Sequence, residues 1–367
     1  MSVRYRTRND GTPYWQVRFR ESGRECSVSW DNPVEADQYD RLVKQVGPTR
    51  AREICKIAAA PLRGTTVRTW LARHNDGLAG IEAGTLARYR AYLANDLGPA
   101  LGDIPLHALS RDDIAGWINT MAKAGASGKT IKNKRDYLSG ALKAAVKAGQ
   151  LTSNPCEDIR APRWDRADKV FLERDEFQIL LNAVREYWRP LVEFLAASGC
   201  RWSEATALKP AAVDRRAGVV QITKAWKTGA GGYMLGVPKT RASVRPVNVP
   251  TSVLDKLDYS GEWLFTNSGR GRRGADGPVR IHSFNPNVWV PAVARARKDG
   301  LTKRPKVHDL RHTCASWLIA AGRPLPAVQA HLGHESIQTT VDVYGSLDRS
   351  SGRGNADAIG NMLNPAN

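Results

Sequence analysis

Two short runs near the N-terminus alternate between apolar and polar side chains. Their apolar members are Trp15, Val17, Phe19, Cys26, Val28 and Trp30. Ser22 and Gly23 lie between the runs and supply a turn, so the pattern predicts a β-hairpin. A helix follows, because Asn32 is a good N-cap before a proline and the apolar spacing then changes to three and four residues. Gly47 ends it, and we expect a small β-sheet-plus-helix module over residues 1–62.

The next hundred residues carry only helical spacing. Apolar side chains recur three and four positions apart in several stretches between residues 63 and 160. The clearest helix runs from Ser127, a plausible N-cap, to Ala148. An Asn-Pro pair at 154–155 ends the helical region, and residues 160–164 read as a linker. We therefore predict an all-α domain over 63–160.

The remainder of the chain combines helical spacing of apolar residues with short runs typical of strands. Helical spacing covers 173–184 and 191–197, and helices resume at Pro286. The β-branched runs at 219–223 and 244–249 predict strands, and residues 263–265 form a third apolar segment. The fold class is therefore mixed and mainly α: the N-terminal module, the helical domain, and an α+β domain with a C-terminal tail over 165–367.

Charge narrows the functional classes. The chain has a formal net charge of +19, and a protein this basic repels itself unless a polyanion neutralises it. Nucleic acid is the commonest such partner, whereas a membrane surface would favour a basic amphipathic helix or tail, which is absent from the sequence. We find no apolar run long enough to span a membrane and no secretory signal, and the five cysteines are scattered singly, as in a reducing cytoplasm. We expect a cytoplasmic, DNA-bound protein.

Basic side chains outside the C-terminal region are candidate DNA contacts. Those on the hairpin are Arg18, Arg20 and Arg24, and those on the helix after Ser127 are Lys129, Lys132, Lys134 and Arg135. Either set can contact phosphate, but two-stranded ribbons and lysine-rich helix faces are also commonly just solvated. The glycine- and arginine-rich stretch 268–278 has the same two interpretations, a phosphate contact or a disordered connector.

Two basic clusters precede the last third of the chain. In the run 198–208, Gly199 permits a close backbone approach and Arg201 begins a helix, where its planar donor fork suits a phosphate. Glycine before arginine is common at helix starts, so the run does not decide a function by itself. In the second cluster, Lys239 lies in a turn before a strand, where a lysine is usually solvated. We expect Arg241 and Arg245 beside it to contact DNA.

The C-terminal region adds histidines, an arginine and a tyrosine. His308 and Arg311 lie one helical turn apart, so both can reach the same anion. His334 follows a glycine, and Tyr344 lies ten residues after it. A single tyrosine in this position is ordinarily a core or surface residue, so its role depends on what surrounds it.

A metal site is the alternative use of these histidines. His308 and His312 are four positions apart, and His331 with His334 would complete a ligand set. However, the glutamate of a zinc-protease helix is absent and an arginine lies between the first pair, which disfavours a bound cation. We predict no metal, and we interpret His312 as a packed helix histidine and His331 as a helix-surface or near-site residue.

Taken in order, these residues resemble the catalytic set of the tyrosine recombinases, the phage-integrase family. The matching set is Arg201, Lys239, His308, Arg311, His334 and Tyr344. The resemblance extends from about residue 165 to 346, and the run from His308 to Tyr344 agrees in both spacing and order. The layout ahead of it also resembles a phage integrase, which implies an arm-type DNA-binding module, a core-type DNA-binding domain and a catalytic domain.

A mechanism follows from the residue types. Arg201 and Arg311 can neutralise the non-bridging oxygens of a phosphodiester, most strongly in the five-coordinate transition state. His308 and His334 can donate hydrogen bonds to the same phosphate, and His308 could also accept the proton of Tyr344. A cationic pocket favours the phenolate of a tyrosine whose pKa is ordinarily near 10.

The resemblance supplies the remaining roles. It implies that Lys239 protonates the departing 5′-oxygen, that Glu204 supports the site without reacting, and that Tyr344 becomes joined to the 3′-phosphate. The phosphotyrosine bond keeps the energy of the broken linkage, so no cofactor is expected. The predicted function is a phage-type integrase that recombines double-stranded attachment sites and integrates, and excises, a mobile genome.

The resemblance also implies partners: a homotetramer on DNA, a DNA-bending host factor and an excision directionality factor. Three alternatives stay open. They are a chromosome or transposon resolvase of the same family, a DNA-binding regulator without catalytic activity, and a type IB topoisomerase, which would relax DNA as a monomer without site choice.

Overall fold

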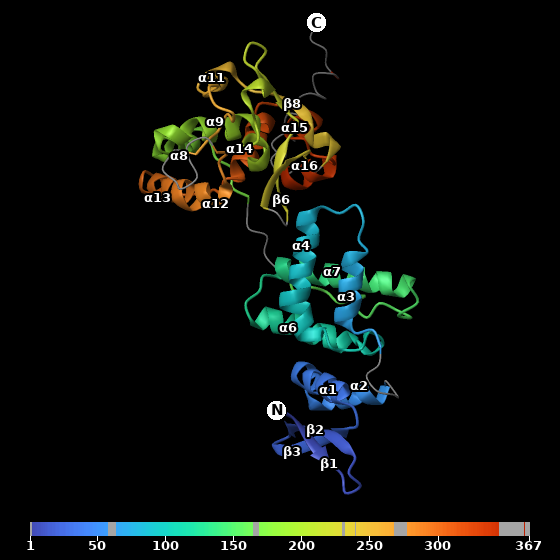
Figure 1. Cartoon of the computed structure of the whole chain (residues 1–367). Helices are drawn as coiled ribbons and strands as arrows, with labels where there is room; N and C mark the ends of the chain where they lie inside the picture. Colours follow the sequence, from blue (N-terminus) through green and yellow to red (C-terminus); the bar gives the residue numbers. More distant parts are fainter. Residues whose placement is uncertain are drawn as a thin grey trace. The chain divides into compact units, whose positions relative to one another are not determined.

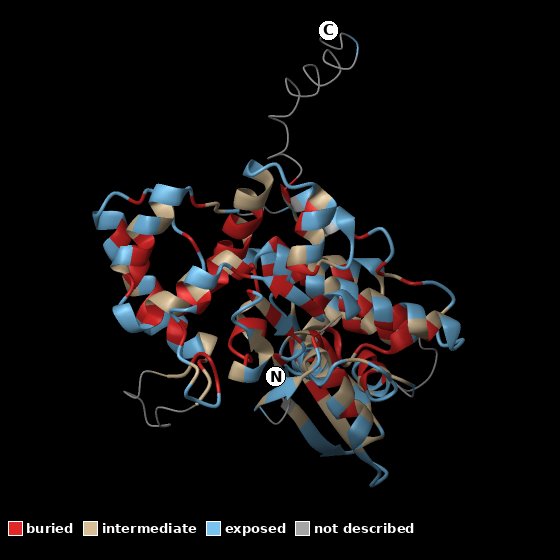
Figure 2. Cartoon of the chain, turned by 90° about the horizontal axis from the view of Figure 1, so that it is seen from above, coloured by how far each residue is buried: buried red, intermediate tan, exposed pale blue. Residues whose placement is uncertain are grey.

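The computed structural model describes residues 2–57, 64–163, 169–229, 232–238, 240–267, 277–344 and 363. The chain divides into two compact units, residues 1–166 and 167–367 (Figure 1). Each has its own core of buried apolar residues, and Figure 2 colours the described residues by how far they are buried.

The first unit begins with a three-stranded antiparallel sheet in the order β1-β2-β3. Its strands are β1 (Ser2–Thr7), β2 (Pro13–Glu21) and β3 (Arg24–Trp30). Ser22 and Gly23 both have positive φ, 51° and 83°, which suits the tight turn of the predicted hairpin. The sequence analysis does not predict β1, because its two apolar residues, Val3 and Tyr5, alternate with arginines and give only a weak strand pattern.

Two helices cover this sheet rather than the one predicted. The side chain of Asn32 accepts a hydrogen bond from the Val34 amide and caps α1 (Pro33–Val46). Gly47 ends α1 as predicted, but Pro48 does not stop the chain from being helical: it begins α2 (Pro48–Ile57). Proline is tolerated at the first position of a helix because its missing N–H would have no partner there.

Helices make up the rest of the first unit. They are α3 (Val67–Asp76), α4 (Ala83–Tyr92), the π-helical segment η1 (Leu93–Leu97), α5 (Gly98–Leu101), the 3-10 turn η2 (Leu106–Ala108), α6 (Arg111–Lys123) and α7 (Gly128–Lys147). Ser127 caps α7, as the sequence predicts. Arg50 of α2 binds Asp113 of α6 through two nitrogens, at 3.1 and 3.0 Å, and one hydrophobic core includes residues from the sheet and from the helices. The division of this unit into domains at residues 62 and 63 stays a prediction.

The second unit combines helices with two small sheets. Strands β4 (Val213–Asp214), β5 (Val219–Ile222) and β8 (Arg245–Asn248) form an antiparallel sheet in the order β4-β5-β8, and β6 (Ala225–Gly229) pairs with β7 (Gly232–Gly236). The β6–β7 hairpin was not predicted. The predicted strands at 219–223 and 244–249 correspond to β5 and β8, whereas the apolar segment 263–265 is buried without being a strand.

The helices of the second unit surround its core. They are α8 (Arg174–Ala183), η3 (Glu186–Trp188), α9 (Arg189–Ser198), α10 (Trp202–Ala205), η4 (Pro210–Ala212), η5 (Arg241–Ser243), α11 (Thr251–Leu254), α12 (Ile281–Phe284), η6 (Asn285–Trp289), α13 (Val290–Lys298), α14 (Asp309–Ala320), α15 (Leu325–Leu332) and α16 (Ile337–Tyr344). Helices α9 and α14 pack together, and α14 also contacts α15. The fold is mainly helical with small antiparallel sheets, which confirms the predicted class. None of the helices within the described ranges is long and apolar enough to cross a membrane.

Candidate active site

The position of Arg201, the first predicted site residue, depends on Gly199, whose backbone is in the left-handed conformation. Helix α9 ends at Ser198, and Gly199 follows with φ of 58°. A Cβ on Gly199 would lie 2.6 Å from Cδ2 of Leu332 and 3.1 Å from Sγ of Cys314, so the backbone passes α14 and α15 too closely for a side chain. This close passage brings Arg201 to the start of α10, where the sequence predicted it.

Glu204 lies between two arginines and is itself buried. One carboxylate oxygen accepts from Nη1 of Arg201 at 2.7 Å, and the other accepts from Nη2 of Arg245 at 3.3 Å. Burial alone would raise the pKa of this carboxyl, but Arg245 and Arg201 together hold it below the usual value. Glu204 is therefore ionised and fixes the orientation of both guanidinium groups.

The expectation that Arg245 contacts DNA is wrong. Its side chain is buried, and all three of its nitrogens already have acceptors inside the protein. Besides Glu204, these acceptors are the carbonyl oxygens of His331, at 2.8 Å, and Ser243, at 3.0 Å. The sequence could not distinguish this arginine from Arg241, which is exposed in η5 and stays a candidate DNA contact.

Arg311 contributes a buried guanidinium with spare donor capacity. It lies on α14 with only 3% of its surface exposed, and Nη1 donates to the carbonyl of Gly199 at 2.7 Å. Its Nη2 is buried and has no hydrogen-bond partner among the residues that the structure describes. Burial and the neighbouring Arg201 lower the pKa of Arg311 to about 10, which still leaves the group charged at neutral pH. A buried donor without a partner on a cation is what an oxyanion would satisfy.

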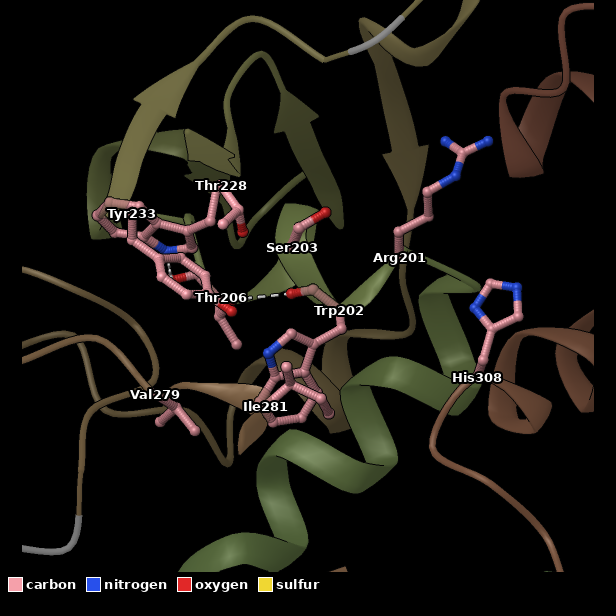
Figure 3. Close-up of a pocket in the computed structure, with 10 residues that line it drawn as sticks. Arg201, Trp202, Ser203, Thr206, Thr228, Tyr233, Val279, Ile281 and His308 are labelled. Atoms are coloured by element: carbon pink, nitrogen blue, oxygen red, sulfur yellow. Dashed lines mark hydrogen bonds between the residues drawn. The ribbon is translucent and has the colours of Figure 1, made fainter. Parts of the chain in front are cut away.

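The pKa values of His308 and His334 are both lowered by burial and by these arginines. His308 directly precedes α14 and, with Arg201, lines one edge of a pocket of about 310 Å³ (Figure 3). Desolvation of its ring, with Arg311 and Arg201, lowers the pKa of His308. Burial and the same arginines lower the pKa of His334 to about 4, and its Nδ1 lies 2.9 Å from the hydroxyl of buried Thr340. At neutral pH His334 is neutral and His308 is biased toward the neutral form.

Tyr344 is the last residue of α16 and is completely buried. Its ring is stacked on that of His334, with centroids 6.4 Å apart, and Phe171 lies 6.2 Å away. The hydroxyl lies 2.9 Å from Nδ1 of His312. Burial raises the pKa of this phenol above its usual value.

His312 is the residue that sequence reasoning missed. It was interpreted as a packing histidine, but its ring nitrogen is the hydrogen-bond partner of the Tyr344 hydroxyl. The available signal was its position four residues after His308, which places both rings on one face of α14; their centroids are 5.1 Å apart. His331, in contrast, is half-buried with its Nε2 3.7 Å from Sγ of Cys314.

Lys239 lies outside the described residues. The residue after it is described: the hydroxyl of Thr240 lies 2.9 Å from that of Ser243, which accepts a hydrogen bond from Arg201 at 3.1 Å. No three His, Cys, Asp or Glu side chains are grouped to hold a metal ion within the parts of the chain that the structure describes.

The candidate DNA contacts of the first unit differ in availability. Arg20, Arg24 and Lys129 are exposed. Three others have acidic partners: Arg18 lies 3.7 Å from Glu25, Lys132 pairs with Asp136, and Lys134 binds Asp96 at 2.5 Å with 14% of its side chain exposed. Arg135 also lies beside Asp136. All seven stay predictions, and the geometry favours the exposed three.

Comparison with known proteins identifies the family. Residues 170–350 match the model described as the phage integrase family. Residues 170–350 of the chain form a domain of this family, that of the tyrosine recombinases. Among curated relatives, it is 24% identical to the ICEBs1 integrase of Bacillus subtilis (strain 168), over 70% of this chain and 72% of that protein. It is 29% identical to the tyrosine recombinase XerC of Xylella fastidiosa (strain 9a5c), over 73% of this chain and 88% of that protein.

Solved structures show the same fold. The Tn1549 transposon integrase in complex with a circular intermediate DNA superposes with a TM-score of 0.68 at 20% identity, covering 77% of this chain and 95% of that one. A lambda integrase dimer bound to a core site gives a TM-score of 0.59 at 20% identity, covering 95% of both chains. The family and the enzyme class predicted from the sequence, a tyrosine-type site-specific recombinase, are confirmed.

Proposed function

We propose that this recombinase cuts and rejoins double-stranded DNA at specific sites, with Tyr344 as the nucleophile. The observation that carries the proposal is the buried guanidinium of Arg311, whose Nη2 has no partner within the described ranges, in a site that also holds Arg201, His334 and Tyr344. Two fixed cations with an unsatisfied donor form a site for a phosphodiester, and the only hydroxyl nucleophile of the predicted set lies beside them.

Each residue then has a physical role. Arg201 and Arg311 bind the non-bridging oxygens and stabilise the charge that grows in the five-coordinate transition state. Glu204 keeps Arg201 in place, and His308 and His334, when neutral, donate one N–H each to the phosphate. Tyr344 forms a bond to the phosphorus and the 5′-oxygen leaves, so that the DNA becomes attached through its 3′-phosphate.

The proposal assigns the proton for the departing 5′-oxygen to Lys239. Thr240, the next residue in the sequence, lies within hydrogen-bond distance of Ser243, which accepts a hydrogen bond from Arg201, and this supports a role for the lysine near the phosphate. Attack of the free 5′-hydroxyl of a second strand on the phosphotyrosine reverses the chemistry and joins the new strand. Because the covalent intermediate stores the energy of the broken bond, the reaction needs no cofactor.

We further propose that the enzyme integrates and excises a mobile genome, and that residues 1–62 and 63–160 bind arm-type and core-type DNA. The fold likeness to lambda integrase supports this layout over that of a resolvase, because it extends over 95% of this chain. A lambda integrase tetramer is known on a Holliday junction, and we propose a homotetramer here too. A DNA-bending host factor, a directionality factor and action in the cytoplasm belong to the same proposal.

A covalent capture experiment tests the nucleophile. The full chain is incubated with a library of nicked duplexes of random sequence, and DNA that stays attached after denaturation with detergent is amplified and enriched over several rounds. We expect enrichment of a defined sequence with the wild-type chain and none with Tyr344→Phe.

The matched control is Tyr259→Phe, which removes a hydroxyl that donates to the carbonyl of Leu254 at 2.9 Å. This variant should capture the same sequence as the wild type. A covalent complex that survives in Tyr344→Phe, or a wild-type chain that captures nothing while it binds DNA, would refute the proposed function.

A further inference from the structure

We propose that His312 is the general base that removes the proton of Tyr344 during strand cleavage. The inference rests on the proposed function. It assigns to His312 the proton-accepting role that the sequence analysis considered for His308. It adds a residue to the predicted catalytic set, because His312 touches the reacting oxygen itself.

Hydrogen-bond geometry distinguishes the two histidines. The Tyr344 oxygen lies 2.9 Å from Nδ1 of His312, within the range required of a base that takes a proton directly. His308 makes no hydrogen bond to Tyr344 within the described part of the chain, and its ring centre is 5.1 Å from that of His312. His308 points instead to the edge of the pocket that it shares with Arg201 (Figure 3).

The charge state of His312 suits a base. Burial, with His308 beside it, lowers the pKa of His312 to about 4, so the ring is neutral at physiological pH and Nδ1 is free to accept. The phenol hydroxyl is the stronger acid of the pair, so Tyr344 donates and His312 accepts. The proton is therefore already directed at Nδ1 before any phosphate arrives.

Helix α14 couples this base to the phosphate site. Arg311 and His312 are adjacent and differ in direction by about 100° around the helix, so one faces Gly199 while the other faces Tyr344. A rigid helix thus fixes the base relative to the arginine that binds the phosphate. When a phosphate binds beside Arg311, its negative charge offsets the positive charge that His312 gains.

The proposed step balances as follows. The Tyr344 oxygen bonds to phosphorus as its proton passes to Nδ1 of His312, and the bond from phosphorus to the 5′-oxygen breaks. The leaving oxygen takes a proton from a separate acid, which the proposed function assigns to Lys239. On resealing, the attacking 5′-hydroxyl passes its proton back to the separate acid, and the His312 imidazolium returns its proton to the departing Tyr344 oxygen, so no net proton is consumed over the cycle.

The test measures the single-turnover rate of covalent complex formation on the enriched nicked duplex. General base catalysis contributes about 10²- to 10⁴-fold, so His312→Ala should slow the step by about 100-fold or more. His331→Ala is the matched control: it removes another half-buried histidine of the same unit, outside the proposed machinery, and should leave the rate unchanged. Far-ultraviolet circular dichroism and DNA affinity verify that both variants are folded.

A second measurement separates base catalysis from packing. Tyr344 is replaced by a fluorinated tyrosine whose phenol has a lower pKa. Because this phenol loses its proton more readily, its attack on phosphorus depends less on a general base. The rate difference between the wild type and His312→Ala should then fall from about 100-fold to about 10-fold or less.

Two results would overturn the inference while leaving the proposed function intact. One is a His312→Ala variant that forms the Tyr344 complex as fast as, or faster than, the wild type. The hydrogen bond would then hold the tyrosine in its resting position without assisting proton removal. The other is a rate difference that fluorination does not change, which would mean that His312 only packs against the ring.

Discussion

The buried carboxylate of Glu204 allows one prediction to be worked out from the structure. We consider Glu204→Gln, which keeps the size and one acceptor oxygen but removes the charge. In the wild type, Arg245 and Glu204 have only 6% and 2% of their side chains exposed, so water hardly screens the pair. Arg201 is 37% exposed, and we therefore assign its ion pair with Glu204 little of the effect.

The expected loss comes mainly from Arg245. Removing one partner of a buried ion pair costs about 3–5 kcal/mol, because the remaining charge is left uncompensated in the interior. Glutamine still offers an oxygen, so we expect the lower end, about 3 kcal/mol. For a unit the size of residues 167–367, this corresponds to a fall in Tm of about 6–12 °C.

Thermal unfolding of the full chain, followed by hydrogen exchange in peptides of the second unit, measures this change. The matched control is Glu262→Gln, since Glu262 pairs with Lys209 but is 63% exposed; it should cost less than about 1 kcal/mol. Because the pKa of Glu204 is lowered in the folded state, its contribution is present above the ordinary glutamate pKa of about 4.3 and disappears as the pH falls below it. Equal destabilisation by the two variants, at neutral pH, would refute the reasoning.

Two further predictions concern the backbone and DNA binding. Gly199→Ala should destabilise the second unit by about 2 kcal/mol or more in chemical denaturation, because it adds a clash with Leu332 to the strain of a positive φ; Gly322→Ala, with φ of 72° and nothing within 4 Å, has only the strain and should cost clearly less. Exposed Lys129 should contribute more to DNA binding than Lys134, which binds Asp96. We expect Lys129→Ala to reduce the salt slope of duplex affinity by about 0.9 in fluorescence anisotropy and Lys134→Ala to reduce it less, so equal slopes would contradict this assignment.

The sequence predicts those parts of the fold that depend on local patterns. The cap at Asn32, the turn at Ser22 and Gly23 and the helix after Ser127 all rest on neighbouring residues, and all are present. Strand β1 was missed because its outward positions are arginines, which also occur in unstructured basic tails. The second covering helix was missed because proline ends one helix and begins the next with the same signal.

The candidate site likewise has some features that the sequence predicts and others that depend on contacts between distant segments. The order and spacing of Arg201, Arg311 and Tyr344 could be recognised in the sequence. The burial of Arg245 could not, because it depends on a carboxylate and two carbonyls contributed by other segments. The contact between His312 and Tyr344 joins residues on two helices, and no local pattern specifies it.

The complete burial of Tyr344 has a consequence for when the enzyme can act. Exposing a side chain of this size costs about 2 kcal/mol, and breaking its hydrogen bond to His312 adds about 1 kcal/mol. At about 1.4 kcal/mol per tenfold, an isolated chain would present its hydroxyl to solvent less than about 1% of the time. A free chain that meets DNA by chance would thus almost never expose the hydroxyl of the proposed nucleophile, and we expect strand breaks only where DNA binding supplies the missing free energy.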